Sequence, residues 1–423
     1  MHQDWDIKSF DFNSTYLNGE LDANKEIYMQ APPGYNNDQH TVKHLRKSLY
    51  SLKQASRCWY DTLIRALKSL RFSTSIADLG VFVAHVGNEI LILVVHVDDC
   101  ILTGSSGKLI AEYKQKLNSC YTLTDLGPVH WLLGIKIMCN RATHMLSLSQ
   151  GSYIDTILSC FTLFEAKAYG TPMAPGVSYS KKDSPTSPDE AVHMKNTPYR
   201  EAIGSLMYAA VTVAMHLDIA FAVSTLSQFL DNLGDAHWEA AKRVFHYLTG
   251  TKDFQLTFGT ERHDLEGYMD ADSATQEHRR AISGYAFLFD SGTISWSSRK
   301  QELVTLSTAE AEYVAATHAA KETIWLRKLF GELLPESSSL TPFYCNNQAM
   351  LRLATEENYY AHTKHIDVCY HFIHQVAESG AIKLEYCSTK DMVADLLTKA
   401  LPRYKTLAHT SSLSLRRTCG GVL

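Results

Sequence analysis

The sequence predicts an α/β protein of mixed class (α+β), in which short apolar strands alternate with helices. Three observations support this prediction. Paired apolar runs flank short polar turns early in the chain, largely apolar helical segments fill the middle, and the last part follows the order strand, strand, strand, helix, strand, helix. With 423 residues, 45% of them hydrophobic and 20% charged, the chain has the composition of a globular protein of two or three domains.

Two strand pairs are expected in the first 150 residues. The turn VGNE at residues 86–89 separates the apolar runs GVFVAHV and ILILVVHV, which is typical of a β-hairpin. A helix is expected from Lys108 to Leu117, and then a second strand pair, VHWLLGIKIM and MLSLSQ, which turns at NRAT. Residues 171–190 are rich in Pro, Ser and Lys and have the composition of a linker.

The rest of the chain is expected to form a helical region and a sheet. Residues 199–230 and 236–248 have largely apolar helical patterns. From about residue 264, the segments LEGYMDADS, GYAFLFD and TISWSS predict strands, TAEAEYVAATHAAKETIWLRKLFGEL a helix, PFYCNN a strand, and DMVADLLTKAL a final helix that carries an acid. The last residues, 404–423, are basic and rich in Ser, which predicts disorder.

Several classes of protein are disfavoured by composition. No apolar run is long enough to span a bilayer, and the start, MHQDWDIKSF, lacks the basic-then-apolar pattern of a signal peptide, so we expect an intracellular protein. Nine cysteines, an odd number without any Cys-x-x-Cys, disfavour a disulfide framework and a cysteine-rich zinc site. We expect these cysteines to be reduced and buried.

The net charge of −5 hides one basic region. Between residues 43 and 71, eight basic residues stand against one acid, and Tyr50, Trp59 and Tyr60 are interleaved with them. This composition suits a surface that faces a polyanion, with aromatic rings that stack on bases. It is equally typical of the solvated basic face of a helix, so both interpretations remain.

Two adjacent carboxylates, Asp98 and Asp99, interrupt the apolar run LILVVHVDDCIL. Unpaired buried charges are costly, so such a pair needs a partner or a metal. A third acid, Asp11, lies at the end of a possible short strand in FDFNSTYLNGEL. Carboxylates from two strands that meet at one pocket suit a pair of Mg²⁺ ions, which stabilise the attacking and leaving oxygens in phosphoryl transfer. On spacing alone, a solvated hairpin turn explains these acids equally well.

Motifs along nearly the whole chain resemble one family. FDFNSTYLNGEL with EIYMQAPPGY is similar to a first catalytic block, SLYSLKQASRCWY to a template and nucleotide block, and VHVDDCIL to a catalytic hairpin. YREAIGSLMYAA, DIAFAVSTLSQFL and AHWEAAKRVFHYLTGTKD resemble a helical connection region, and GYMDADSA, SGYAFLFDSGTISWSSRKQELVTLSTAEAEY, TKHIDVCYHFI and VADLLTKALP resemble ribonuclease H. In this order, from residue 3 to about 402, the motifs resemble the C-terminal part of the Pol polyprotein of copia-type LTR retrotransposons, reverse transcriptase followed by ribonuclease H.

The resemblance implies a right-hand polymerase palm lacking most of the fingers, a helical thumb and connection region, and a ribonuclease H-like mixed sheet with flanking helices. In the family, a long fingers segment precedes the first catalytic block. Here that block starts near the beginning of the given sequence, so most of the fingers is expected to be missing. The implied domains are an N-terminally truncated palm at 1–168, a linker at 169–195, a thumb/connection region at 196–262, a ribonuclease H-like domain at 263–402 and a basic tail at 403–423.

For the polymerase, the resemblance implies that Asp11, Asp98 and Asp99 are catalytic ligands of Mg²⁺, for which Mn²⁺ can substitute. One metal would lower the pKa of the primer 3′-hydroxyl, and the second would neutralise the triphosphate. Tyr16 matches an aromatic that crowds the sugar 2′ position, although the sequence alone fits a core aromatic. The other implied nucleotide- and template-binding residues, which also fit an exposed helix and a bulged strand, are Gln54, Arg57, Leu133 and Gly134.

For ribonuclease H, the resemblance implies that Asp270, Glu312 and Asp395 are catalytic metal ligands. Glu310 lies two residues from Glu312, so it is expected to point elsewhere, at the surface. The family's remaining ligand follows the Cys of Tyr-Cys-Asp-Asn-Gln, but this chain has YCNNQ, with Asn346 in that place. An amide offers one neutral oxygen and no charge, so metal affinity should fall. We expect ribonuclease H activity that is severely weakened or absent.

Several histidines gather in and just before TKHIDVCYHFIHQ: His362, His365, His371 and His374. His371 and His374 could share one helix face, which raises the hypothesis of a zinc site. No acid or cysteine quartet there has the spacing of structural zinc, so we favour contact with a substrate strand or helix packing.

Two interpretations from different classes remain. In the first, the chain is an RNA-directed DNA polymerase with an impaired ribonuclease H, which acts in retrotransposon replication on an RNA template, a DNA primer, RNA/DNA hybrid and deoxynucleoside triphosphates. In the second, it is a catalytically inactive Pol remnant that at most binds nucleic acid, which Asn346 and the missing fingers favour. The family implies a cytoplasmic location in virus-like particles, allows a nuclear stage, and implies no membrane partner.

Overall fold

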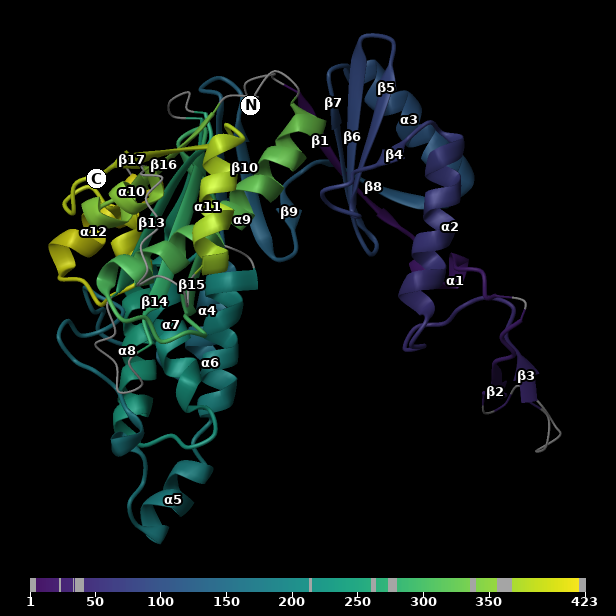
Figure 1. Ribbon diagram of the computed structural model, residues 1–423. Helices are drawn as coiled ribbons and strands as arrows, with labels where there is room; N and C mark the ends of the chain where they lie inside the picture. Colours follow the sequence, from purple (N-terminus) through teal and green to yellow (C-terminus); the bar gives the residue numbers. More distant parts are fainter. Residues whose placement is uncertain are drawn as a thin grey trace. The chain divides into compact units, whose positions relative to one another are not determined.

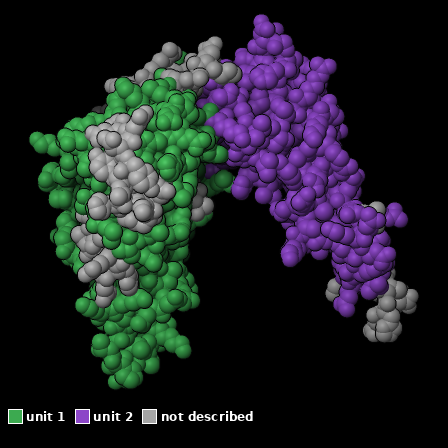
Figure 2. Space-filling model, viewed as in Figure 1, with its two compact units in different colours: residues 1, 133–327, 336–423 green, residues 2–132, 328–335 purple. Residues whose placement is uncertain are grey.

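The computed structural model describes residues 5–22, 24–32, 34, 42–212, 215–259, 264–272, 280–334, 340–355 and 367–417. The chain forms two compact units, shown in different colours in Figure 2. The N-terminal unit comprises residues 2–132 and 328–335, and the C-terminal unit comprises residues 1, 133–327 and 336–423. Both units combine sheets with helices, which confirms the predicted mixed α/β class.

The N-terminal unit is built on a six-stranded sheet in the order β4-β5-β6-β7-β1-β8 (Figure 1). Its neighbouring strands are antiparallel. The hairpin predicted at residues 86–89 is confirmed, since β5 and β6 pair from Val81↔Val94 to Val86↔Glu89. The strands are β1 (Asp6–Phe12), β4 (Ser73–Thr74), β5 (Val81–Val86), β6 (Glu89–His96), β7 (Asp99–Gly104) and β8 (Leu123–Pro128).

Two helices, α2 (Ala55–Ser69) and α3 (Gly107–Cys120), pack on the sheet of this unit. α3 confirms the helix predicted at residues 108–117. Trp59, Leu63 and Leu67 follow one another at single-turn spacing along α2 and are buried with residues of β1, β5, β6 and β7. The unit also contains a short helix, α1 (Thr15–Asn18), and a two-stranded sheet of β2 (Tyr28–Gln30) and β3 (Val42–His44).

The C-terminal unit contains the predicted mixed sheet, in the order β15-β14-β13-β16-β17. β13, β14 and β15 are antiparallel, whereas β16 and β17 run parallel to β13 and to each other. The structure adds a strand, β17, and replaces the predicted final helix by one 3₁₀ segment, η6 (Val393–Leu397). The elements are β13 (Glu266–Asp272), β14 (Ile282–Phe289), β15 (Gly292–Lys300), α9 (Thr308–Leu333, of which residues 328–333 belong to the N-terminal unit), β16 (Thr341–Cys345), α10 (Gln348–Thr355), α11 (Asp367–Glu378) and β17 (Ile382–Tyr386).

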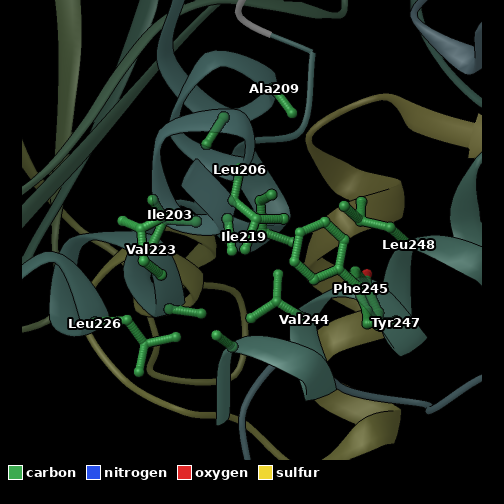
Figure 3. Packing of buried hydrophobic residues seen from close by; sticks show 14 of the residues in the cluster. Ile203, Leu206, Ala209, Ile219, Val223, Leu226, Val244, Phe245, Tyr247 and Leu248 are labelled. Atoms are coloured by element: carbon green, nitrogen blue, oxygen red, sulfur yellow. The ribbon is translucent and has the colours of Figure 1, made fainter. Parts of the chain in front are cut away.

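A helical region forms the largest core of the C-terminal unit. Figure 3 shows Ile203 and Leu206 of α6 directed toward Val223 of α7 and toward Val244 and Phe245 of α8. The structure confirms the predicted helical segments but interrupts the first with a π-turn at Tyr208–Thr212 and a 3₁₀ turn at Leu217–Ile219. The helices are α4 (Gly151–Cys160), α6 (Tyr199–Met207), α7 (Ala220–Leu226) and α8 (Asp235–Thr251).

A second sheet explains why the compact units differ from the predicted domains. β10 (Ile135–Asn140) and β11 (Met145–Ser149) confirm the second predicted strand pair. However, β11 also pairs with β12 (Phe254–Phe258), beyond the helical region. This pairing joins the segment to the C-terminal unit, so the compact boundary falls between residues 132 and 133 and not at residue 168. The predicted linker contains two short helices, η1 (Lys181–Asp183) and α5 (Pro188–Lys195).

The prediction of a disordered tail is wrong for residues 403–417. This segment forms α12 (Arg403–Ser412) and β18 (Leu415–Arg417). β18 pairs with β12 through Leu256↔Leu415 and Phe254↔Arg417, and Leu413 and Leu415 are buried. The partner strand lies far away in the sequence, so the basic, Ser-rich composition alone could not predict this tertiary pairing.

Two expectations from composition can be compared with the described residues. None of their helices combines the length and the apolar character that crossing a membrane requires. Eight cysteines in the described part of the chain have free thiols, as predicted. Their predicted burial is wrong for Cys120, Cys139 and Cys160, which are exposed because they lie on solvent-facing positions at or near the ends of α3, β10 and α4.

Candidate active sites

The first candidate site lies at the β6–β7 hairpin of the N-terminal unit. His96 pairs with Asp99 across the hairpin, which leaves Val97 and Asp98 as a two-residue turn. Val97 has a φ of 60°, in the left-handed region that a β-branched side chain rarely adopts. Two-residue hairpin turns require such a φ at their first central position, so the hairpin imposes this conformation immediately before the two acids.

The neighbouring strand β1 brings a third carboxylate to the hairpin. Asp11 is the register partner of Asp99, and directly opposite residues in an antiparallel pair have Cβ atoms about 4.5–5.5 Å apart on the same face. The backbone N–H of Phe12 donates a hydrogen bond of 3.1 Å to the Asp98 carbonyl oxygen, which ties the turn to β1. The structure therefore brings together the three acids predicted for the polymerase site.

The acids of this hairpin site influence one another electrostatically. Partial burial, and then the negative charges of Asp98 and Asp99, raise the pKa of Asp11. Burial and the same acids raise the pKa of the Cys100 thiol well above its ordinary value. No three His, Cys, Asp or Glu side chains in the described part of the chain form a ready-made metal cage. An open set of carboxylates is compatible with Mg²⁺, which usually keeps waters and substrate phosphates among its ligands.

A buried tryptophan supports the hairpin turn. The Trp59 indole N–H donates a hydrogen bond of 3.0 Å to the Val97 carbonyl oxygen. Its ring is 3% exposed and makes edge contacts with Phe12 and Tyr121. The idea that Trp59 stacks on bases is therefore wrong, because the ring is already enclosed in the core. No signal in the sequence indicates this role, since an aromatic in a basic helix fits several environments.

Three further predicted residues lie on or near α1 and α2 of the same unit. Tyr16 is half-buried, its ring meets Tyr50 at a centroid distance of 5.0 Å, and its hydroxyl accepts a hydrogen bond of 3.3 Å from Ser56. Gln54 is the N-cap position of α2 but makes no side-chain cap. Arg57 is exposed and pairs with Asp61 at 3.4 Å, which agrees with the solvated-helix interpretation of the basic region.

Leu133 and Gly134 belong to the C-terminal unit, whereas the three acids belong to the N-terminal unit. Both residues have positive φ, 49° and 78° respectively, so they form a tight turn before β10. The Leu133 carbonyl oxygen accepts a hydrogen bond of 3.4 Å from the Tyr208 hydroxyl of the helical region. The turn agrees with the predicted irregular strand.

The second candidate site is a buried acidic cluster in the C-terminal unit. It consists of Asp270 on β13, Glu312 on α9 and Asp395 on η6, whose exposed fractions are 1%, 5% and 1%. Burial, and then the Asp270 charge, raise the pKa of Glu312 well above its ordinary value. The same two causes raise the pKa of Asp395 to about 6. The structure thus brings together the three acids predicted for ribonuclease H.

Three polar side chains surround these acids. The Lys399 ammonium lies 3.3 Å from Asp270 Oδ2 and 2.8 Å from Asp395 Oδ1. The Thr398 hydroxyl donates a hydrogen bond to Asp270 Oδ2, and the Asn346 amide donates one of 3.3 Å to Asp270 Oδ1. Sequence reasoning missed Thr398 and Lys399. The four-residue spacing of Asp395 and Lys399 in DLLTK was the available signal.

The prediction that Glu310 lies at the surface is wrong. Glu310 is 7% exposed and accepts a hydrogen bond of 2.6 Å from the Leu306 backbone N–H, while its own N–H donates to the Ser307 hydroxyl at 3.3 Å. Ser307 therefore caps the start of α9, and the Glu310 carboxylate ties the preceding residue to the same turn, which fixes the helix that carries Glu312.

Two histidines of the group, His371 and His374, contact Tyr370 on α11, and the ring centroids of His371 and Tyr370 lie 5.7 Å apart. His374 on α11 places its ring 4.3 Å from that of Tyr370, and its Nε2 lies 3.1 Å from the Leu353 carbonyl oxygen. This arrangement supports helix packing for His374. His362 and His365 lie outside the described residues.

The motifs and the hairpin site define the class of protein. Residues 1–175 match the family model described as "Reverse transcriptase (RNA-dependent DNA polymerase)". The retrovirus-related Pol polyprotein from transposon TNT 1-94 of Nicotiana tabacum is 40% identical over 95% of this chain, and that from transposon RE2 of Arabidopsis thaliana is 34% identical over 99%. The chain belongs to the copia-type retrotransposon Pol polyproteins, and it spans about 30% of the first relative and 28% of the second.

A solved ribonuclease H structure aligns with part of this chain. The structure of LC11-RNase H1 in complex with RNA/DNA hybrid aligns with 32% of this chain and 94% of that protein, at 18% identity and a TM-score of 0.25.

Proposed function

We propose that this chain is an RNA-directed DNA polymerase that acts in retrotransposon replication, with RNA template, DNA primer and deoxynucleoside triphosphates as substrates. The observation that carries the proposal is the convergence of Asp11, Asp98 and Asp99 at one hairpin, with the pKa of Asp11 raised by burial and by the other two acids. The family assignment of residues 1–175 supports the same activity.

The carboxylates of the hairpin site fit Mg²⁺, with Mn²⁺ as a substitute. Burial, and then repulsion by Asp98 and Asp99, raise the pKa of Asp11, and a divalent cation would relieve that repulsion. Asp11, Asp98 and Asp99 would hold a pair of ions. When bound, one ion would lower the pKa of the primer 3′-hydroxyl and the second would neutralise the triphosphate.

The protein groups around the acids position them and the substrates. Trp59 holds the Val97 carbonyl and thereby the turn that carries Asp98. Tyr16 is proposed to crowd the sugar 2′ position, and its contacts with Tyr50 and Ser56 fix its ring for that purpose. Gln54 and Arg57 are proposed to contact the nucleotide and template, and the Leu133–Gly134 turn to grip the primer.

The acidic cluster of the C-terminal unit supports only a weak ribonuclease H, or none. Asn346 brings an N–H where a negatively charged ligand is expected, and Lys399 adds a positive charge. The test is cleavage of the RNA strand of an RNA/DNA hybrid, compared with an Asp270→Asn variant. Cleavage by the unaltered chain well above that of the variant would contradict this part of the proposal.

Primer extension on an RNA template tests the polymerase proposal. The reaction contains Mg²⁺ and deoxynucleotides, and the control is the Asp98→Asn/Asp99→Asn double variant. Extension that the double variant loses would support the proposal. No extension, with hybrid binding that weakens steeply as salt rises, would instead support a non-catalytic nucleic-acid binder. The proposed place of action is the cytoplasm, within virus-like particles, with a nuclear stage.

A further inference from the structure

The ammonium group of Lys399 lies between two buried carboxylates of the acidic cluster. The side chains of Asp270 and Asp395 are each 2% exposed, and they come from a strand and from a 3₁₀ turn that lie more than 100 residues apart in the sequence. The ammonium lies 3.3 Å from one and 2.8 Å from the other, so it bridges both elements. A cation that lies between two carboxylates offsets their negative charges, as a bound metal ion would.

The oxygen atoms of Asp270 are already engaged by protein donors. Oδ1 accepts the Asn346 amide N–H at 3.3 Å, and Oδ2 accepts the Thr398 hydroxyl besides the ammonium. A carboxylate oxygen can only accept, so Asn346 must turn its NH₂ group and not its carbonyl oxygen toward Asp270. The residue that sequence reasoning kept as a neutral oxygen ligand therefore acts as a donor to the cluster.

The backbone holds Lys399 in this place. The N–H groups of Thr398 and Lys399 donate to the Asp395 carbonyl oxygen at 3.3 Å and 3.2 Å, so the lysine is fixed on the turn that carries one of its partners. Gly284 is the register partner of Asp270. A Cβ at Gly284 would lie 2.7 Å from Thr398 Cγ2. Because glycine has no side chain, the turn that carries Thr398 and Lys399 can lie close to the sheet at this position.

A divalent cation does not fit the cluster in this arrangement. It would have to break both ion pairs of the Lys399 ammonium, whose side chain is 34% exposed, with carboxylates that are 2% exposed, and to take its place between them. It would also gain only three acidic groups, because Asn346 contributes no charge.

We infer that the Lys399 ammonium is the resident cation of this cluster and that it excludes divalent metal ions from it. The cluster then joins β13, α9 and the η6 turn as a charge-balanced structural unit. This inference is independent of the polymerase proposal, because every group involved lies in the C-terminal unit.

Mn²⁺ titration of the full chain tests the inference, with free Mn²⁺ followed by its paramagnetic resonance signal. Asp98→Asn/Asp99→Asn serves as the background chain, so that the hairpin site does not contribute. We expect the background chain to bind no Mn²⁺ at the cluster up to about 1 mM. Adding Lys399→Met should create one site with a Kd at least about tenfold lower, and a further Asp270→Asn should remove it.

A matched lysine variant controls for the loss of a positive charge. Lys383 lies on β17 of the same unit and pairs with Glu385 at 2.8 Å, but its side chain is 62% exposed. Lys383→Met should create no Mn²⁺ site. In thermal unfolding, Lys399→Met should lower the Tm without metal, and Mn²⁺ should raise it again, whereas the background chain should show no such rise.

Two results would overturn the inference. The first is a Mn²⁺ site in the background chain that Asp270→Asn removes, which would show that the metal displaces Lys399. This result would refute the inference even if the Lys399→Met chain does not fold. The second is a folded Lys399→Met chain that gains no site, which would show that Lys399 is not the excluding group.

Discussion

The indole N–H of Trp59 donates to the carbonyl oxygen of Val97, 38 residues along the chain, at 3.0 Å. Val97 is the turn residue with positive φ immediately before Asp98 and Asp99. Edge contacts with Phe12 and Tyr121 hold the Trp59 ring, and with it the donor, in place. A core residue on a helix thus fixes the backbone of the turn that carries two of the three acids.

Trp59→Phe should therefore impair catalysis as well as stability. It removes the hydrogen bond and part of the ring volume, which together should lower the free energy of unfolding by about 1–2 kcal/mol. Displacement of the turn should lower the rate of nucleotide addition between about tenfold and a hundredfold. Tyr60→Phe is the matched control, because its hydroxyl donates to the Leu79 carbonyl oxygen at 3.1 Å, away from the turn. Equal rate losses in both variants would refute a positioning role for Trp59.

Tyr16→Ala should relax discrimination against ribonucleotides. If the ring crowds the sugar 2′ position, its removal should raise the incorporation of ribonucleotides relative to deoxynucleotides by about tenfold or more. Tyr16→Phe keeps the ring and loses only the hydrogen bond from Ser56, so it should retain the discrimination. An unchanged ratio in the Ala variant, measured by single-nucleotide incorporation, would leave Tyr16 as an ordinary packing residue.

Gly284→Ala should destabilise the C-terminal unit. The added Cβ would lie 2.7 Å from Thr398 Cγ2 and 2.9 Å from Leu397 Cβ, so the turn that carries Asp395 and Lys399 must move away from the sheet. We expect a loss of about 1–3 kcal/mol in the free energy of unfolding. Gly204→Ala on α6 meets no atom within 4 Å and should instead stabilise its helix by up to about 1 kcal/mol. Denaturant unfolding of both variants compares the two directly, and equal effects would argue against close packing at Gly284.

Buried histidines should make the protein less stable in mild acid. His237 is fully buried, its Nδ1 accepts the Gly234 backbone N–H at 2.9 Å, and burial lowers its pKa although Asp183 and the Ser180 carbonyl oppose the shift. Burial lowers the pKa of His318 and His409 in the same direction.

The sign of this pH dependence follows from proton uptake. Above the ordinary histidine pKa of about 6.5, both the folded and the unfolded forms are neutral and these groups contribute nothing. Below it, the unfolded chain takes up protons that the folded chain does not, so the free energy of unfolding falls as the pH falls. His237→Gln should reduce the fall in Tm between pH 7 and pH 5, whereas His85→Gln, at an exposed position, should leave it unchanged. A Tm that does not change over this range would contradict the expectation.

Local sequence patterns predicted the elements that depend on local pairing. The turn VGNE and the alternating runs around it specified the β5–β6 hairpin, and the motif VHVDDCIL specified the hairpin that carries the acids. The same patterns could not predict β18, because its pairing with β12 depends on a distant strand and on the burial of Leu413 and Leu415. The same patterns could not predict the burial of Trp59, because it depends on which elements pack against α2.

The acids of both sites were predicted, but their partners were not. Glu310 was misplaced because helix periodicity alone ignores the hydrogen bonds that Glu310 makes with Leu306 and Ser307 at the start of α9. Lys399 was missed because a basic residue near the end of a predicted helix is usually solvated. Only the close packing of the η6 turn on Gly284 brings its ammonium to Asp270.

The rate of first-deoxynucleotide addition to a primer on an RNA template, in Mg²⁺, tests the central claim most directly. The variants are Asp11→Asn and Asp99→Asn, with Asp125→Asn on the neighbouring strand β8 as the control acid. We predict that each hairpin-site variant loses at least about 10³-fold in rate, since its carboxylate holds the catalytic cation, and that the control stays within about twofold. Addition by Asp11→Asn or Asp99→Asn within about tenfold of the unaltered chain would contradict the claim that these carboxylates form one catalytic site.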